Sequence, residues 1–126
     1  MMVLADTSIW IDHFRRSDAR LARFLDRGDI VMHSFVIGEL VLGRVPKIAD
    51  IIDDLHSLPR AIAANTDEVL KFISDRKLSG SGIGYVDAHL LAAAALAAET
   101  FVWTRDKRLH AAAQSLSLAA EIGEKR

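Results

Sequence analysis

Short blocks of apolar residues recur along the chain, separated by polar stretches in which apolar positions follow a helical spacing. Apolar runs of four or five residues, bounded by charged or turn residues, are typical of buried strands. We expect strands at 2–5, 29–33, 60–64, 100–103 and 116–120. The run 60–64 gives the weakest signal of the five.

Capping residues and helical spacing predict the helices that lie between these strands. Four stretches with helical periodicity follow a residue that can act as an N-cap, namely Ser8, Ser17, Ser34 and Thr66. Gly28 is suited to end a helix and Pro46 to open one. We expect helices after Ser8, from Ser17 to Gly28, and over 35–43, 46–57, 66–77, 85–98 and 106–114.

Short apolar strands that alternate with helices indicate an α/β fold whose parallel sheet is covered on both faces. We therefore expect a three-layer α/β/α architecture with a mainly parallel central sheet. The chain has 126 residues and no repeat or linker, so we interpret 1–126 as a single domain. The segment 78–84, LSGSGIG, is a predicted turn or loop. Binding sites in such folds form outside the carboxyl ends of the strands.

Four acidic residues are placed to lie near that edge of the sheet. Asp6 follows the first strand, Glu39 lies in the helix after the second, Asp87 lies near the start of the alanine-rich helix, and Asp106 follows the strand 100–103. A structural interpretation is also open. Asp6 and Asp106 are suitable as turn or cap residues, and Asp87 as a complement to a helix dipole.

Glu39 and Asp87 are harder to explain as structural residues, because their helices are apolar. Both are expected on buried faces, and neither helix contains a lysine or arginine to pair with them. An unpaired buried carboxylate is costly, and several carboxylates together repel one another. A hard divalent cation relieves both problems. The pattern therefore predicts a site for Mg²⁺, or Mn²⁺, with Asp87 as a ligand or as the holder of a bound water.

Composition and charge set limits on the possible functions. Half of the residues (51%) are hydrophobic, which favours a folded core, and charges interrupt every apolar run before the length of a membrane span. The opening MMVLADTS reaches Asp6 too early for a signal peptide. The absence of cysteine excludes disulfides and fits a cytoplasmic location. The net charge of −1 gives no support for nucleic-acid binding, which must depend on local patches.

Two groups of basic residues are candidates for contacts with phosphate groups. The first follows helical spacing in the second predicted helix, and the second surrounds Asp106. They comprise Arg16, Arg20, Arg23 and Arg27, and Arg105, Lys107 and Arg108. The alternative is a solvated helix face, because Asp18 and Asp26 are interleaved with the first group. Tyr85 is the one aromatic residue expected to be available for stacking on an RNA base.

Other chemistries are disfavoured by the motifs that the sequence lacks. The five histidines form neither HxH nor HExxH, which argues against a zinc enzyme. Neither GxGxxG nor GxxxxGK[ST] occurs, so dinucleotide-binding and P-loop functions are not supported.

The chain resembles the PIN-domain ribonucleases, and in particular the VapC toxins of toxin–antitoxin pairs. The resemblance is carried by VLADTSIWID, SFVIGELVLG, GYVDAHLLAAAA and VWTRDKRL, in this order and spacing. It implies that Asp6, Glu39, Asp87 and Asp106 form an acidic, metal-binding quartet. It also implies supporting roles for Thr7, Ser8 and Thr104, although Ser8 also suits a helix cap. The resemblance further implies an RNA substrate, a small antitoxin partner and a homodimer.

The expected reaction is the hydrolysis of an RNA phosphodiester by a metal-activated water, leaving a 5′-phosphate and a 3′-hydroxyl. Two alternatives remain open. One is a Mg²⁺-dependent phosphatase of the haloacid-dehalogenase type, which needs Asp-x-Asp where this chain has Asp6-Thr7-Ser8. The other is a non-catalytic PIN-like module that acts through protein contacts.

Overall fold

A parallel sheet of three strands lies at the centre of the molecule. The structure is a computed structural model, and it describes residues 1–123. The strands β1 (Met2–Ala5), β2 (Ile30–Val31) and β3 (Thr100–Trp103) are arranged in the order β2-β1-β3. Val3 is opposite Ile30 on one side and opposite Phe101 on the other. The carboxyl ends of the strands therefore lie at the same edge.

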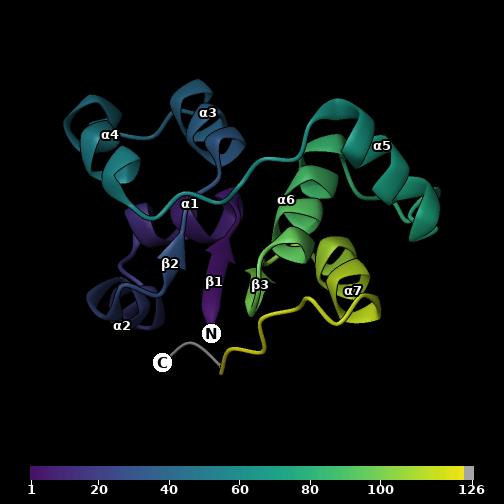
Figure 1. Cartoon of the computed structure of the whole chain (residues 1–126). Coiled ribbons are helices and arrows are strands. Elements are labelled where there is room, and N and C mark those ends of the chain that lie inside the picture. The colour runs from purple at the N-terminus through teal and green to yellow at the C-terminus, as the bar shows by residue number, and fades with distance from the viewer. Residues whose placement is uncertain (124–126) are drawn as a thin grey trace.

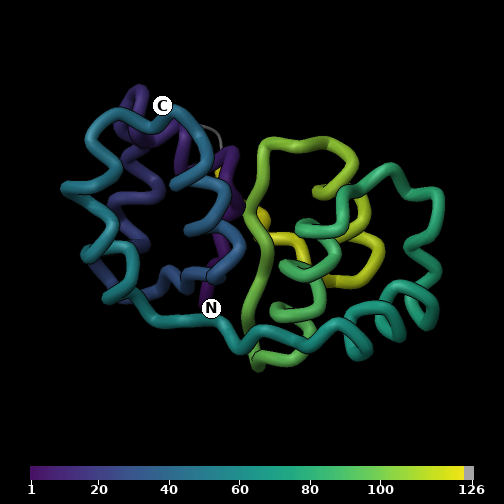
Figure 2. Tube along the Cα trace, turned by 90° about the horizontal axis from the view of Figure 1, so that it is seen from above, coloured from purple at the N-terminus to yellow at the C-terminus, as the bar shows by residue number. Residues whose placement is uncertain are grey.

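Helices cover the sheet from both sides. Figures 1 and 2 show α1 to α4 on one side of the strands and α5 to α7 on the other. This confirms the predicted three-layer α/β/α fold. Within residues 1–123 the helices are α1 (Thr7–Arg15), α2 (Ala19–Arg27), α3 (Ser34–Leu42), α4 (Ile48–Ser57), α5 (Thr66–Asp75), α6 (Tyr85–Leu96) and α7 (Lys107–Ser115).

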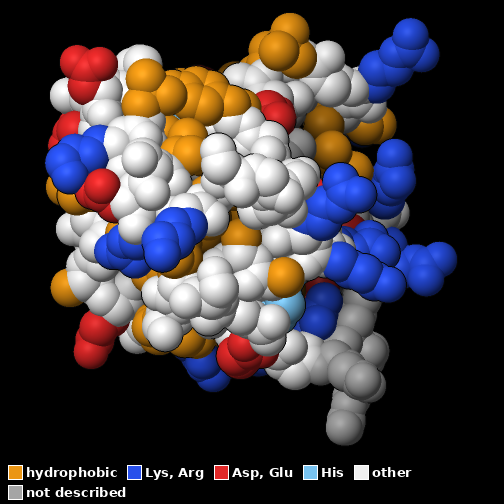
Figure 3. Space-filling view, turned by 90° about the vertical axis from the view of Figure 1, so that its right-hand side faces the viewer, with side chains coloured by type: hydrophobic (Ala, Val, Ile, Leu, Met, Phe, Trp, Pro, Cys, Tyr) orange, Lys and Arg blue, Asp and Glu red, His pale blue; other side chains and the backbone are white. Residues whose placement is uncertain are grey.

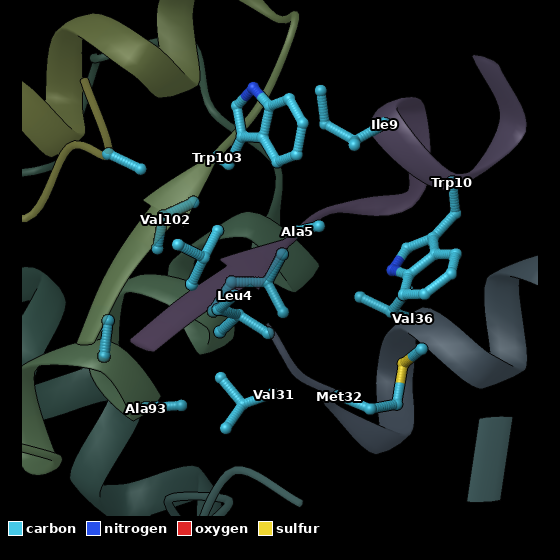
Figure 4. Packing of buried hydrophobic residues seen from close by; sticks show 14 of the residues in the cluster. Leu4, Ala5, Ile9, Trp10, Val31, Met32, Val36, Ala93, Val102 and Trp103 are labelled. Carbon is cyan, nitrogen blue, oxygen red and sulfur yellow. The ribbon is translucent and has the colours of Figure 1, made fainter. Parts of the chain in front are cut away.

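The core is built around the central strand. Val3 and Leu4 are fully buried, as is Val102 of β3. Figure 4 shows Leu4 and Ala5 between Val102 and Trp10 of α1. The helix α6 is buried along 88–94, as its apolar sequence predicts. None of the helices in the described part of the chain has the length and apolarity that a membrane span requires.

Most predicted elements are present, but the helix caps are shifted. Each shifted cap has a carboxylate, amide or imidazole acceptor within two residues of the expected hydroxyl, and this acceptor takes the backbone N–H bond instead. The caps that form are Asp6 instead of Ser8, Asp18 instead of Ser17, His33 instead of Ser34, and Asn65 instead of Thr66. The helix expected from Pro46 begins at Ile48, after Lys47 in a left-handed conformation.

Two predicted strands are reduced to single bridges. The segment 60–64 pairs only through Arg60, opposite Met32, and its one large apolar side chain, Ile62, is exposed. Its alanines have low strand propensity. The segment 116–120 pairs only through Ala119, because Ser117 has a positive φ of 59° that is incompatible with an extended strand.

An ion pair next to the sheet connects three parts of the fold. Asp18 is 2% exposed and caps α2, and Arg20 donates to both of its carboxylate oxygens, from Nε at 3.0 Å and from Nη2 at 2.7 Å. Arg20 also donates to the carbonyl of Gly123 and lies over the ring of Trp103. The hydrogen bonds from Arg20 lower the pKa of Asp18 to about 2.

We expect Asp18→Ala to lower the free energy of unfolding by roughly 2–4 kcal/mol, because it removes a cap and leaves the partly buried Arg20 without its partner. Urea denaturation measures this loss, and Asp26→Ala, at an exposed position of the same helix, is the control. The stabilisation by Asp18 is present above its ordinary pKa of 3.8 and is lost as the pH falls toward 2. Equal effects of the two substitutions would contradict this assignment.

Candidate active site

The first carboxylate, Asp6, is held where β1 ends. It is 6% exposed, and its oxygens accept hydrogen bonds from both sides of the site. Ser8 donates to Oδ1 at 2.5 Å, and the hydroxyl of Thr104, which follows β3, donates to Oδ2. Burial raises the pKa of Asp6, and the bonds from Ser8 and Thr104 oppose that rise. Two hydroxyls predicted to support the site therefore contact this carboxylate directly.

Glu39 is brought to the same region by a contact between two helices. The hydroxyl of Thr7, the first residue of α1, donates to Glu39 Oε1 at 2.6 Å. Since Thr7 follows Asp6 directly, this bond connects α3 to the end of β1. Glu39 is exposed, so the prediction that it lies on a buried face was wrong. The second turn of α3 presents Glu39 to solvent and turns Leu40 into the core.

Asp87 lies in the first turn of α6, where its side chain reaches back over the helix end. Its Oδ2 accepts the backbone N–H of Gly84, the N-cap, at 3.3 Å. Burial raises its pKa, and so does repulsion by the charges of Asp6, Asp106 and Glu39. Asp87 is half-buried. The four carboxylates, from four separate parts of the chain, are therefore close enough to act on one another electrostatically.

Asp106 follows β3 and caps α7. Its Oδ1 accepts from the backbone N–H groups of Arg108 at 2.8 Å and Leu109 at 3.1 Å, and its own N–H donates to Thr104 Oγ1 at 3.0 Å. Thr104 thus connects Asp106 to Asp6. The structural interpretation of Asp6 and Asp106 as caps is correct, but it accounts for only part of their acceptor capacity, because a carboxylate has about four lone-pair sites.

The remaining oxygens are suited to a hydrated cation. Among the described residues, nothing donates to Glu39 Oε2, Asp87 Oδ1 or Asp106 Oδ2. Within residues 1–123, no three acidic or histidine side chains are arranged to hold a metal ion by themselves. Mg²⁺ usually keeps several waters and uses one or two carboxylates directly. The oxygen donor set therefore fits a hydrated Mg²⁺ or Mn²⁺ better than an ion enclosed by protein ligands.

The first group of predicted basic residues is divided by the structure. Arg16 follows the end of α1, so it does not share a helix face with the others. Arg20 is engaged with Asp18. Arg23 and Arg27 line a hollow with Met1, at the amino ends of the strands and thus at the edge of the sheet opposite the carboxylates. Arg16 and Arg20 line a recess beside Thr104, and Arg20 also lines the hollow of Arg23 and Arg27.

The second basic group surrounds the site. Arg105 donates from its backbone to Ser8 Oγ at 3.1 Å and from Nη1 to Asp12 at 2.9 Å. Arg108 lies against Gly82, whose φ of +85° favours glycine, and an added Cβ there would be 2.8 Å from Arg108 Cδ. Lys107 lines a recess with Thr104 and Arg105. Lys and Arg side chains gather along one edge of the face in Figure 3.

Sequence reasoning missed two residues near the site. Asp12, on α1, is partly covered and paired with Arg105. Its spacing of four from Ser8 on α1 is a signal that could have indicated a shared helix face. His110 lines two recesses beside Thr104 and Arg105. No comparable signal in the sequence indicated His110, because its position beside these recesses depends on how α7 packs.

The predicted stacking residue Tyr85 belongs to an aromatic group between α3 and α6. Its ring meets His89 edge-on, with centroids 4.7 Å apart, and Phe35 meets the same histidine at 4.5 Å. His33 is fully buried beside them, and burial lowers its pKa to about 4. Tyr85 remains 48% exposed, so its stacking on RNA stays a prediction.

Comparisons with known proteins agree with this geometry. The family model of the PIN domain matches residues 3–114. Ribonuclease VapC32 of Mycobacterium tuberculosis, from strains CDC 1551 / Oshkosh and H37Rv, is 42% identical over 123 residues, which are 96% of this chain and 99% of the relative. The crystal structure of PAE2754 from Pyrobaculum aerophilum superimposes with a TM-score of 0.60 at 19% identity, covering 91% of this chain and 81% of that one. The chain therefore belongs to the PIN domain family, among its VapC-like members.

Proposed function

We propose that this protein is a metal-dependent endoribonuclease whose catalytic residues are Asp6, Glu39, Asp87 and Asp106. The observation that carries the proposal is the meeting of these four carboxylates at the carboxyl edge of the sheet, three of them with an oxygen that no described residue engages. The relationship to a protein named as a ribonuclease supports the substrate class. Thr7, Ser8 and Thr104 act as positioning residues, because each donates to a carboxylate of this set.

The residues divide the chemistry between them. A bound Mg²⁺ or Mn²⁺ supplies polarisation of the phosphoryl oxygen and a lowered pKa for the attacking water. Glu39, Asp87 and Asp106 would hold it through their unengaged oxygens, in part through bridging waters. One carboxylate of the set accepts the proton of that water. Ser8 and Thr104 fix Asp6 so that its charge stays at the end of β1.

We expect the purified protein to cut single-stranded RNA in Mg²⁺ or Mn²⁺ and to be inactive in EDTA, with 5′-phosphate and 3′-hydroxyl ends. Water attacking in line with the 3′ oxygen gives these ends. Total RNA from cells, treated with the protein and sequenced by methods specific for each kind of end, provides the measurement. Ends with a 2′,3′-cyclic phosphate would contradict the mechanism, because they require attack by the RNA's own 2′-hydroxyl.

The biological role that we propose is that of the toxin in a toxin–antitoxin pair, acting in the cytoplasm. The VapC-like relatives support this role. It predicts a small protein partner that blocks the acidic site, and we further propose that the chain forms a homodimer. Val36 and Leu40 of α3 are fully buried in the core, so they are not available for a dimer interface. The exposed large apolar side chains of α3 are instead Phe35, Val41 and Leu42.

The two alternatives have less support. A haloacid-dehalogenase-type phosphatase needs a second Asp where Ser8 stands, and Ser8 here engages Asp6 Oδ1, the kind of oxygen that would have to act as the nucleophile. A non-catalytic module has no evident use for four carboxylates that repel one another. RNA cleavage in Mg²⁺, with p-nitrophenyl phosphate as a parallel substrate, separates the three functions.

A further inference from the structure

Arg105 stands between the acidic site and a neighbouring recess. Its backbone N–H donates to Ser8, which in turn donates to Asp6, so its main chain belongs to the site. Its guanidinium extends to Asp12 on the same face of α1. Residues four apart on a helix have side chains about 5–6 Å apart. The guanidinium therefore lies about one helical turn from the hydroxyl that holds Asp6, a length comparable with one nucleotide step of a single strand.

Three surface hollows share Arg105 as part of their lining. One contains Ser8 and Asp106 of the candidate site. The second, with a volume of about 670 Å³, contains Thr104, Arg16 and His110, and the third contains Thr104, Lys107 and His110. Among the described residues, Arg16 and Lys107 have no ion-pair partner. A polyanion that leaves the carboxylates in this direction thus meets Arg105 first and further basic side chains after it.

The ion pair between Arg105 and Asp12 can be exchanged for a contact between Arg105 and a phosphate group. The side chain of Arg105 is 62% exposed and that of Asp12 is 21% exposed. Exposed ion pairs contribute little to stability, so Asp12 can orient the guanidinium without making it unavailable. Arg20, by contrast, is held by a buried Asp18. Guanidinium groups bind phosphate with two parallel hydrogen bonds, which a lysine cannot do.

We propose that Arg105 binds an RNA phosphate next to the one that is cut, with Asp12 as the residue that positions its guanidinium. Arg16, Lys107 and His110 form the continuation of this phosphate path away from the acidic site. The inference rests on the proposed ribonuclease function and adds to it the direction in which the RNA leaves the carboxylates. Four of the seven predicted RNA-binding residues are not needed for this path: Arg20, Arg23, Arg27 and Arg108.

The test compares Arg105→Gln with Arg76→Gln, which removes the same charge from the exposed end of α5, on the far flank of the molecule in Figures 1 and 2. Cleavage of a single-stranded RNA oligonucleotide in Mg²⁺ is followed at several KCl concentrations. We expect Arg105→Gln to raise KM about tenfold or more with little change in kcat. It should also reduce the slope of log KM against log salt by about 0.7, the share of one phosphate contact on a single strand. Arg105→Lys should restore the salt slope but only part of the affinity.

The outcomes separate the two levels of the proposal. If the parent protein does not cut RNA in Mg²⁺, the proposed function itself fails. If the parent cuts but Arg105→Gln changes KM no more than Arg76→Gln does, the phosphate site is wrong and the function stands. A loss confined to kcat would also overturn the phosphate site, since such a loss would place Arg105 in the chemical step. Circular dichroism melts, together with the Arg105→Lys variant, establish that the arginine variants are folded.

Discussion

Replacing Asp6 with Asn should reduce RNA cleavage by at least about 100-fold and leave the protein folded. The substitution removes a negative charge at the end of β1 with little change in volume, and positioned acid–base groups contribute about 10²–10⁴-fold to rates. Asn caps helices about as well as Asp, so the bond from Ile9 to this side chain can persist. Initial rates with an RNA oligonucleotide in Mg²⁺ measure the effect, and urea denaturation measures the stability.

A matched substitution separates the lost charge from local disturbance. Asp26→Asn makes the same chemical change at an exposed position of α2, outside the quartet and the proposed phosphate path. We expect its kcat to remain within a few-fold of the parent value. An Asp6→Asn protein that cuts RNA as fast as the parent would refute the assignment of Asp6 as a catalytic residue.

Magnesium should raise the melting temperature of the parent protein by roughly 10 °C at 100 times its dissociation constant. Binding to the folded state alone stabilises it by about 2.7 kcal/mol under this condition, and a chain of this size gains about 4 °C per kcal/mol. The pKa values of Asp6 and Asp87 are raised, first by burial. Without metal, the folded state therefore favours the protonated form of both carboxyl groups. Their contribution to the free energy of unfolding is fully present below the ordinary pKa of 3.8 and is lost as the pH rises through the higher pKa of the folded state.

Asp87→Asn gives the complementary result. It removes the carboxylate that is repelled by the other three, so the metal-free variant should melt at a higher temperature than the metal-free parent near pH 7. It should also lose most of the response to MgCl₂. Thermal melts in MgCl₂, with NaCl at equal ionic strength as the control, measure both effects. The assignment fails if the variant responds to MgCl₂ as strongly as the parent does.

The sequence was sufficient for those parts of the fold in which one local signal dominates. The bounds of β1 and β3 agree with the prediction, because Asp6 ends the apolar run of β1 and Glu99 directly precedes that of β3. The helix α6 begins at Tyr85 as expected, after the glycine-rich loop. Capping was less predictable, because neighbouring acceptors compete for the same N–H groups. At α1 the carboxylate of Asp6 takes the position expected for the hydroxyl of Ser8.

The sequence led to four candidate carboxylates that the structure brings together, but it did not reveal their environment. Apolar neighbours suggested that Glu39 is buried, yet the rotation of α3 exposes it. Helical spacing placed Arg16 and Arg27 on one face, whereas α1 ends before Arg16 and α2 carries Arg27 to the opposite edge of the sheet. The pairing of Arg105 with Asp12 joins residues 93 positions apart. Such contacts depend on tertiary packing, which periodicity along the chain does not report.

The most direct test of the central claim is anomalous diffraction from crystals of the protein soaked in MnCl₂. The account predicts a manganese peak at the carboxyl edge of the sheet, coordinated by oxygens of Asp87 and Asp106, with Asp6 and Glu39 ligating it directly or through water. It would be contradicted by crystals in which manganese binds elsewhere, or in which these four carboxylates are engaged only by arginine and lysine.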